Sequence, residues 1–115
     1  MQYMLLIHSD ERAATTATPE QISEMMGAYM AYSQALSEAK VMAGGNRLRP
    51  TSAATSVRIV NGKTKIQDGP FADTKEQLGG YYLIDVPDLD AALSWAARCP
   101  GARFGTIEVR PIWQM

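Results

Sequence analysis

Few side chains in this sequence can move a proton near neutral pH, and one of them is unique. His8 is the only histidine, and Ser9, Asp10 and Glu11 follow it directly. An imidazole exchanges protons near neutral pH, so His8 is a candidate general acid or base. The alternative is a histidine at the end of a strand that has no chemical role.

A second candidate lies in the stretch KIQDGPFADTKEQLGGYY, residues 65–82. Asp68 opens a connection that reaches Leu78 before the next apolar run begins. Connections of roughly 12 residues between neighbouring strands are uncommon and are often functional. Asp68 is therefore a candidate general base or substrate-binding carboxylate, because such residues are concentrated in loops.

Local turn chemistry explains the same stretch without catalysis. Asp favours the first position of a turn, and Gly69-Pro70 imposes an extended bend. Asp73 and Glu76 have the spacing of a capping pair for one helical turn, and Phe71 can anchor the loop on the core. This interpretation leaves only the length of the connection unexplained.

A third candidate comes from the last predicted strand, where Glu108 and Arg110 alternate onto one face. If Ile107 and Val109 face the helices, Glu108 and Arg110 face the opposite side, toward a cleft between two subunits. Arg110 is then a candidate substrate-binding residue for an anion, because guanidinium groups bind carboxylates and phosphates well. The alternative is an ion pair of Arg110 with Glu108 or with a second subunit.

No set of residues suggests a metal or a nucleotide cofactor. One histidine and one cysteine are too few for a typical zinc site, and no acidic cluster has EF-hand spacing. The glycine pairs in GGN and LGGYY do not belong to a dinucleotide-binding or P-loop pattern. We therefore expect no cofactor and no metal.

Composition restricts the class of protein. The 115 residues, 46% hydrophobic and 20% charged, fit one globular domain over residues 1–115. The net charge of −1 and the lack of a basic block argue against nucleic acid as a partner. Cys99 is the only cysteine, which excludes an intrachain disulfide and suits a reducing cytoplasm.

The sequence also lacks the signals of a membrane protein. No apolar run approaches the roughly 18 residues that indicate a membrane span. The beginning, MQYMLLIHSDE, has no basic leader and no cleavage-like site. We therefore interpret it as a first strand and not as a signal peptide.

Periodicity predicts the elements that position these residues. Thr18-Pro19 with Gln21 marks the start of an amphipathic helix that ends near residue 39 or 40. Asp88 caps a second helix, which a Pro-Gly pair at 100–101 ends. Strands are expected within residues 3–8, 41–48, 56–67, 79–86 and 104–113.

The segment 56–67 has the strongest local signal. Asn61-Gly62 favours a two-residue hairpin turn, because both positions need positive φ. That turn pairs Val57 with Ile66 and puts Val57, Ile59 and Ile66 on one face. The alternation predicts a half-buried hairpin.

The order of elements is β-α-β, a β-hairpin, and β-α-β. It predicts an α+β fold, a ferredoxin-like βαββαβ sandwich with an extra β-hairpin, in which both helices cover one face of the sheet. The other face also needs cover, since apolar residues of the central strands point to both sides; they are Tyr3, Met4, Tyr81, Tyr82, Leu83 and Ile84. A second copy, packed sheet to sheet across a two-fold axis, is the simplest cover.

The stretch DGPFADTKEQLGGYYLIDVPDLDAALSWAARCP resembles the DGPF branch of the YCII-related family. YMLLIHSDE, MAGGNRLRP and GTIEVRPI extend the resemblance over nearly the whole chain. The resemblance implies a dimeric α+β barrel, usually a homodimer. It also implies a regulatory link to sigma factors, because DGPF-branch genes often lie beside those of extracytoplasmic-function sigma factors.

The wider family has been proposed to be enzymatic from a His–Asp pair in a cleft and a likeness to muconolactone isomerases. The histidine of that pair belongs to the first helix in relatives of the other branch. The matching stretch here, MMGAYMAYS, has no histidine, so the pair is not carried over and the isomerase analogy is weakened.

Three functions remain open. The first is a small cytoplasmic enzyme using acid–base chemistry in a dimer cleft, with His8 and Asp68 as catalytic residues and Arg110 as the substrate anchor. The second is a non-catalytic module that binds a small molecule or a protein, linked to sigma-factor regulation. The third is a loop around Asp68 that only completes the dimer. We rank the enzyme first.

Overall fold

The computed structural model describes residues 1–114. Its strands are β1 Gln2–Ser9, β2 Met42–Arg47, β3 Thr55–Val60, β4 Lys63–Asp68, β5 Gln77–Asp85 and β6 Thr106–Pro111. Its α-helices are α1 Glu11–Thr15, α2 Pro19–Glu38 and α3 Leu89–Arg98. Two short 3₁₀ turns, η1 Thr51–Ala53 and η2 Pro100–Arg103, complete the chain.

A four-stranded antiparallel sheet forms the body, in the order β2-β5-β1-β6. β1 and β5 are central, and their register pairs Tyr3 with Ile84 and Leu5 with Tyr82. This order joins the first and last strands of the chain at one side of the sheet. The α+β class and the ferredoxin-like arrangement predicted from the sequence are confirmed.

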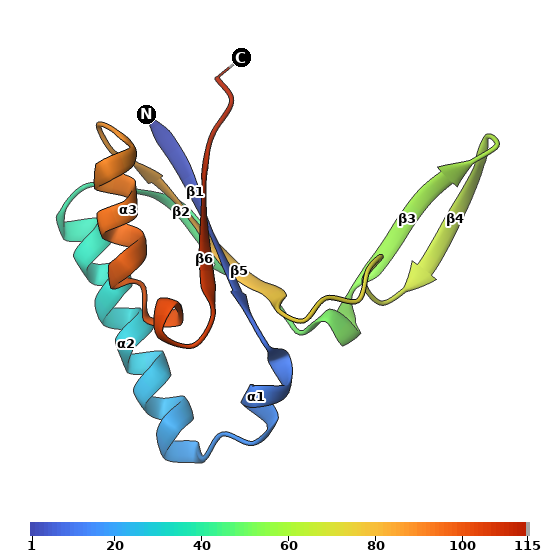
Figure 1. Cartoon of the computed structure of the whole chain (residues 1–115), viewed down its shortest axis with the longest axis horizontal. Helices are drawn as coiled ribbons and strands as arrows, with labels where there is room; N and C mark the ends of the chain where they lie inside the picture. The colour runs from blue at the N-terminus through green and yellow to red at the C-terminus, as the bar shows by residue number, and fades with distance from the viewer. Residues whose placement is uncertain (115) are drawn as a thin grey trace.

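Both long helices lie on the same face of this sheet (Figure 1). Tyr32 of α2 contacts Tyr82 of β5 edge to face at 5.3 Å between ring centres, and its hydroxyl donates to the Trp95 carbonyl of α3 at 2.6 Å. One residue thus ties both helices to the sheet. The buried core is Tyr3, Leu5, Tyr32, Leu36, Tyr82, Ile84, Val86, Ala92, Ala96 and Cys99.

The helix boundaries follow the capping signals of the sequence. Thr18 and Gln21 form the reciprocal capping box of α2, and the Asp88 side chain accepts from the Ala91 amide at the start of α3. The short helix α1 was not predicted. Its cap is Asp10, whose carboxylate accepts from the amide and the guanidinium of Arg12.

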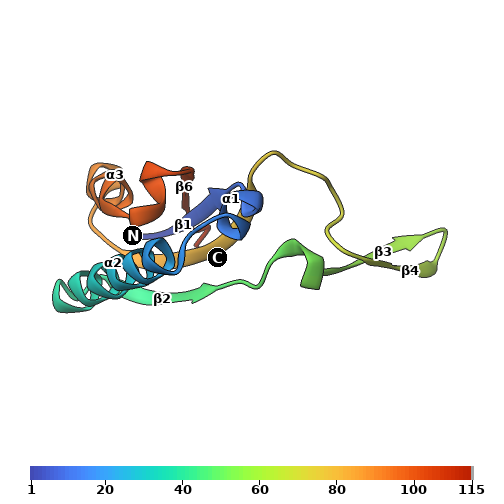
Figure 2. The ribbon, with the colours of Figure 1, turned by 90° about the horizontal axis from the view of Figure 1, so that it is seen from below.

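The hairpin β3–β4, residues 55–68, is a separate two-stranded sheet that we call the arm. Its register is the predicted one, with Val57 opposite Ile66, but the expectation that it is half-buried is wrong. Val57, Ile59 and Ile66 are 62%, 67% and 71% exposed, and the arm projects away from the body (Figures 1 and 2). The alternation of residue types along the hairpin shows which of its faces is apolar. No part of the four-stranded sheet or its helices packs against that face.

The loop that leads from the arm back to β5 also differs from its prediction. Residues 73–76 form no helical turn, and the Glu76 carboxylate instead accepts from the Thr106 hydroxyl at 2.9 Å. Phe71 is 84% exposed and does not anchor the loop on the core. The Gly69 amide, at φ +90°, donates to the Ala54 carbonyl at 2.7 Å and closes the base of the arm.

Among the helices of residues 1–114, none has the length and apolarity needed to cross a bilayer.

Candidate functional site

The face of the sheet opposite the helices, which we call the open face, carries the candidate site. Tyr3 and Leu5 point into the core, so the alternating positions of β1 and their strand neighbours point outward. Apolar and polar side chains mix there, and most are only half-buried. They are Met4, Leu6, His8, Asn46, Tyr81, Leu83, Thr106, Glu108 and Arg110.

Three of the polar side chains form a chain of contacts across β1 and β6. His8 Nε2 lies 3.5 Å from Oε1 of Glu108, diagonally across the two strands. The second oxygen of Glu108, Oε2, accepts from Nε of Arg110 at 2.9 Å and also from its Nη2. Glu108 and Arg110 lie on one face of β6, as the alternation of the sequence predicts, and Glu108 also contacts His8 of β1.

The neighbours of Glu108 keep its carboxylate in the charged form. The hydrogen bond from Arg110 lowers the pKa of Glu108, and the nearby His8 adds a smaller effect in the same direction. Glu108 therefore stays ionised at neutral pH and orients its neighbours, since a carboxylate so held does not take up a proton readily. The imidazole of His8 is the group of the three suited to exchange a proton.

Further polar groups surround His8 and extend toward the arm. Thr106 pairs with His8 in the register of β1 and β6, and its hydroxyl donates to Glu76. The end of the loop from the arm is thereby fixed beside His8. On the other side of the open face, Asn46 Nδ2 donates to the Tyr81 hydroxyl at 2.9 Å.

Asp68 lies elsewhere. It is the last residue of β4, opposite Thr55 at the base of the arm, and its side chain is exposed. No hydrogen bond or ion pair connects it to His8 among residues 1–114. The structure thus brings together His8 and Arg110 of the three predicted site residues, while Asp68 belongs to a different sheet.

Sequence reasoning did not single out Glu76, Asn46 or Tyr81 as part of a site. Glu76 was assigned to a helix cap on spacing alone, and the cross-strand contact with Thr106 could not be read from one strand. Asn46 and Tyr81 belong to strands that only the register of β2 on β5 places opposite each other. The sequence offered one signal for Asn46 and Tyr81, namely that each is a polar residue at an alternating position of its own strand.

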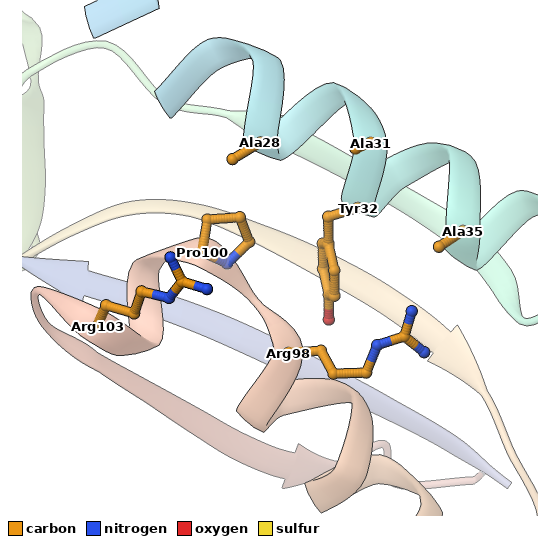
Figure 3. A pocket seen from close by; sticks show the side chains of 7 residues that line it. All are labelled: Ala28, Ala31, Tyr32, Ala35, Arg98, Pro100 and Arg103. Atoms are coloured by element: carbon orange, nitrogen blue, oxygen red, sulfur yellow. The ribbon is translucent and has the colours of Figure 1, made fainter. Parts of the chain in front are cut away.

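A hollow lies away from this open face, on the helix side of the molecule (Figure 3). It is a groove of about 310 Å³ between α2 and the α3–η2 segment, lined by Ala28, Ala31, Tyr32, Ala35, Arg98, Pro100 and Arg103. The guanidinium of Arg98 lies over the Trp95 ring, 4.3 Å from its centre. No histidine or carboxylate lines this groove, so it suits binding better than proton transfer.

The thiol of Cys99 is not available for chemistry. Cys99 is 1% exposed, and burial raises the pKa of its thiol. Its sulfur lies 4.0 Å from the Tyr29 hydroxyl, and burial likewise raises the pKa of Tyr29 above its usual range. Buried thiols of this kind are structural and unreactive.

Metal ligands do not gather within the described part of the chain. No group of three or more His, Cys, Asp and Glu side chains there is arranged to hold an ion. Glu11, which lies near His8 in sequence, is occupied by the amide and hydroxyl of Thr51 at 2.7 Å each.

Comparison with known proteins identifies the family. The model of the YCII-related domain matches residues 1–115, and the chain belongs to this family. An uncharacterised protein of Rhizobium meliloti (strain 1021) is 40% identical over 114 residues, which cover 97% of this chain and 92% of that protein. The narrower assignment to the DGPF branch stays a prediction.

A solved structure shares the fold. The 5-chloro-2-hydroxyhydroquinone dehydrochlorinase of Burkholderia phenoliruptrix AC1100, in complex with 2,5-dihydroxybenzoquinone, superposes with a TM-score of 0.54. The match covers 99% of this chain and 94% of that chain at 14% identity. At this identity the likeness concerns the fold.

Proposed function

We propose that this protein is a small cytoplasmic enzyme that uses acid–base chemistry on a small anionic molecule. The site is the open face, closed into a cleft by a second copy of the chain. His8 exchanges a proton with the substrate, Glu108 orients the imidazole, and Arg110 anchors the negative charge.

The observation that carries this proposal is the contact chain from His8 through Glu108 to Arg110. A histidine oriented by a carboxylate is a recurring arrangement for general acid–base catalysis. Both bonds of Arg110 to Glu108 end on one oxygen, and a guanidinium carries five N–H groups. The remaining donors of Arg110 are therefore free to bind an anionic substrate.

The second copy is proposed because the open face is amphipathic. Met4, Leu6 and Leu83 lie half-buried beside the polar chain of contacts, and a sheet normally buries both faces when both carry apolar groups. A partner sheet would also exclude water from His8 and strengthen the electrostatic interactions around it. Asp68, which belongs to the arm, enters the site only if the second copy brings it there.

The neighbour of known structure suggests a substrate class. That protein is a dehydrochlorinase with bound 2,5-dihydroxybenzoquinone, a small ring with acidic hydroxyl groups. Such a molecule offers a negative charge for Arg110 and a proton for His8. We therefore propose small acidic phenols, quinones or enols as the class to be tested.

Calorimetric titration with 2,5-dihydroxybenzoquinone tests the site. The proposal expects Arg110→Ala to weaken binding at least about tenfold, since hydrogen bonds to charged groups contribute roughly 1.5–3 kcal/mol. Arg103→Ala in the groove of Figure 3 is the matched control and should leave the affinity unchanged. The reverse result, with Arg103 required and Arg110 dispensable, would place ligand binding in the groove and contradict the proposal.

The alternative function is a non-catalytic module that binds a small molecule or a protein, linked to sigma-factor regulation. The exposed apolar face of the arm favours it, because such surfaces often mark protein contacts. Affinity capture from the source cell with the intact protein as bait tests it. Recovery of a sigma factor by the wild type and its loss on Val57→Asp would support this alternative.

A further inference from the structure

Another polar contact lies on the open face, toward the edge of the sheet opposite Glu108. Asn46 of β2 pairs with Tyr81 of β5, and Asn46 Nδ2 donates to the Tyr81 hydroxyl at 2.9 Å. The contact is no part of the core, because Tyr82, the next residue of β5, is the one that points toward the helices. It also stays separate from the contact chain of Glu108. A polar pair with neither of these roles is available to a ligand.

The direction of this hydrogen bond determines what the Tyr81 hydroxyl can still do. A tyrosine hydroxyl has one proton to donate and can also accept. Because the hydroxyl accepts from Asn46, its own proton remains free for another partner. Within residues 1–114 the Tyr81 hydroxyl makes no other hydrogen bond. Asn46 therefore holds Tyr81 as a hydrogen-bond donor on the open face.

A single row of paired residues connects this donor with the proposed site. The row crosses the sheet from β2 to β6 in the order Asn46, Tyr81, Leu6 and Glu108. Residues paired across neighbouring strands project to the same side of a sheet, so all four side chains share the open face. Leu6, which is half-buried, separates the two polar ends of the row.

The apolar floor between the polar ends suits one small ring. Neighbouring strands lie about 4.8 Å apart, so β5 and β6, which flank β1, are separated by about 10 Å. A hydrogen bond of roughly 2.8 Å at each end leaves space between them for a planar ring. Met4 and Leu83 pair with each other in the next row, are half-buried and extend the floor beside Leu6. An apolar floor with a few polar groups at its edges fixes the orientation of a small ligand.

We propose that Tyr81 binds a second oxygen of the substrate and thereby selects rings that carry oxygen atoms on opposite sides. The ring lies over Leu6. One of its oxygens is held at Arg110 and the opposite oxygen accepts the proton of the Tyr81 hydroxyl. This inference rests on the proposed function, since it uses the anchor at Arg110, and it narrows the substrate class. A ring with oxygens on one side only would satisfy Arg110 and leave Tyr81 without a partner.

Calorimetric titration with two acidic rings tests this selection. 2,5-Dihydroxybenzoquinone carries oxygens on opposite sides of its ring, whereas tropolone carries both of its oxygens on adjacent carbons. Tyr81→Phe should weaken binding of the quinone at least about tenfold and change that of tropolone less than twofold. Tyr82→Phe is the matched control, because the Tyr82 hydroxyl is bonded to Ser33 of α2 at 2.8 Å. It should change neither affinity.

Asn46→Asp tests the direction of the hydrogen bond. A carboxylate at this position cannot donate, so it would accept the proton of Tyr81 and withdraw it from the ligand. The quinone should then bind about as weakly as it does to Tyr81→Phe, while tropolone loses much less affinity. Similar losses for both rings would indicate general repulsion of anions and contradict the role of Asn46.

The outcomes separate this inference from the proposed function. No loss of quinone affinity in Tyr81→Phe, or equal losses for the two rings, overturns the selection by Tyr81 and leaves the anchor at Arg110 intact. If Arg110→Ala weakens neither ring, or if the wild type binds neither, the proposed function fails and this inference fails with it.

Discussion

The strands of the body sheet and of the arm have similar residue patterns but differ in how deeply their apolar side chains are buried. In β5, Ile84 is 0% exposed, whereas Ile66 of the arm is 71% exposed. Both residues alternate with neighbours on a regular antiparallel ladder. The comparison shows that the sequence pattern determines the strand and its faces, while the energy of each face depends on what lies against it.

The largest expected effect separates these two isoleucines. Ile84→Ala should lower the free energy of unfolding by about 2–5 kcal/mol at any protein concentration, because it leaves a cavity in the core. Ile66→Ala should change the free energy of unfolding by less than about 0.5 kcal/mol, as exposed substitutions do. Urea unfolding at several protein concentrations distinguishes the two. Equal, concentration-independent losses would show that the arm is covered within its own chain.

Two glycines sharpen the same contrast. A Cβ at Gly105 would collide with the carbonyl of His8 and touch Ser9, whereas one at Gly62 would meet nothing. Gly105→Ala should cost about 1–3 kcal/mol, as overpacking does, and should displace His8. At position 62, where φ is +75°, an alanine would be strained by about 1 kcal/mol. The exposed tip of the arm can shift and relieve part of this strain. Thermal unfolding measures both. A larger loss at Gly62 would contradict the difference in packing.

The cap of α2 gives an intermediate effect. Thr18→Ala removes the side chain that accepts from the Gln21 amide and should cost about 1 kcal/mol. Thr64→Ala, an exposed threonine of the arm, is the matched control and should cost much less. Chemical denaturation reports both values. Indistinguishable losses would mean that the capping box contributes nothing to the body.

The smallest effect concerns acid. The side-chain hydrogen bond from Arg12, followed by its backbone amide, lowers the pKa of Asp10 to about 2, below roughly 3.9 in an unfolded chain. A lowered carboxyl pKa stabilises the fold above the unfolded value and loses this contribution as the pH falls through the folded value. We expect a small loss of stability between about pH 4 and pH 2 that Asp10→Asn abolishes. An unchanged acid profile in this variant would contradict the assignment.

Much of the fold could be predicted from the sequence, because the signals are local. The caps at Thr18 and Asp88 and the Asn61-Gly62 turn act within a few residues, and all three are found where expected. The exposure of the arm could not be predicted, since it depends on where β2 and β5 carry the hairpin. The short helix α1 was missed because a single cap, Asp10, sustains it.

The site was only partly predictable for the same reason. His8 and Arg110 were identified by residue type and by alternation along single strands. Their connection through Glu108 needs the stagger of β1 against β6, which no single strand contains. Asp68 was selected because the loop that follows it is long. The structure gives this length another reason, because the loop has to lead from the projecting arm back to β5.

The most direct test of the account uses the fact that His8 is the only histidine. In a long-range proton–nitrogen NMR spectrum, its ring gives one unambiguous pair of nitrogen signals. We predict that saturating 2,5-dihydroxybenzoquinone shifts these signals in the wild type, and that Arg110→Ala abolishes the shift at the same concentration. Ligand binding that leaves the His8 signals unmoved in the wild type would contradict a site on the open face.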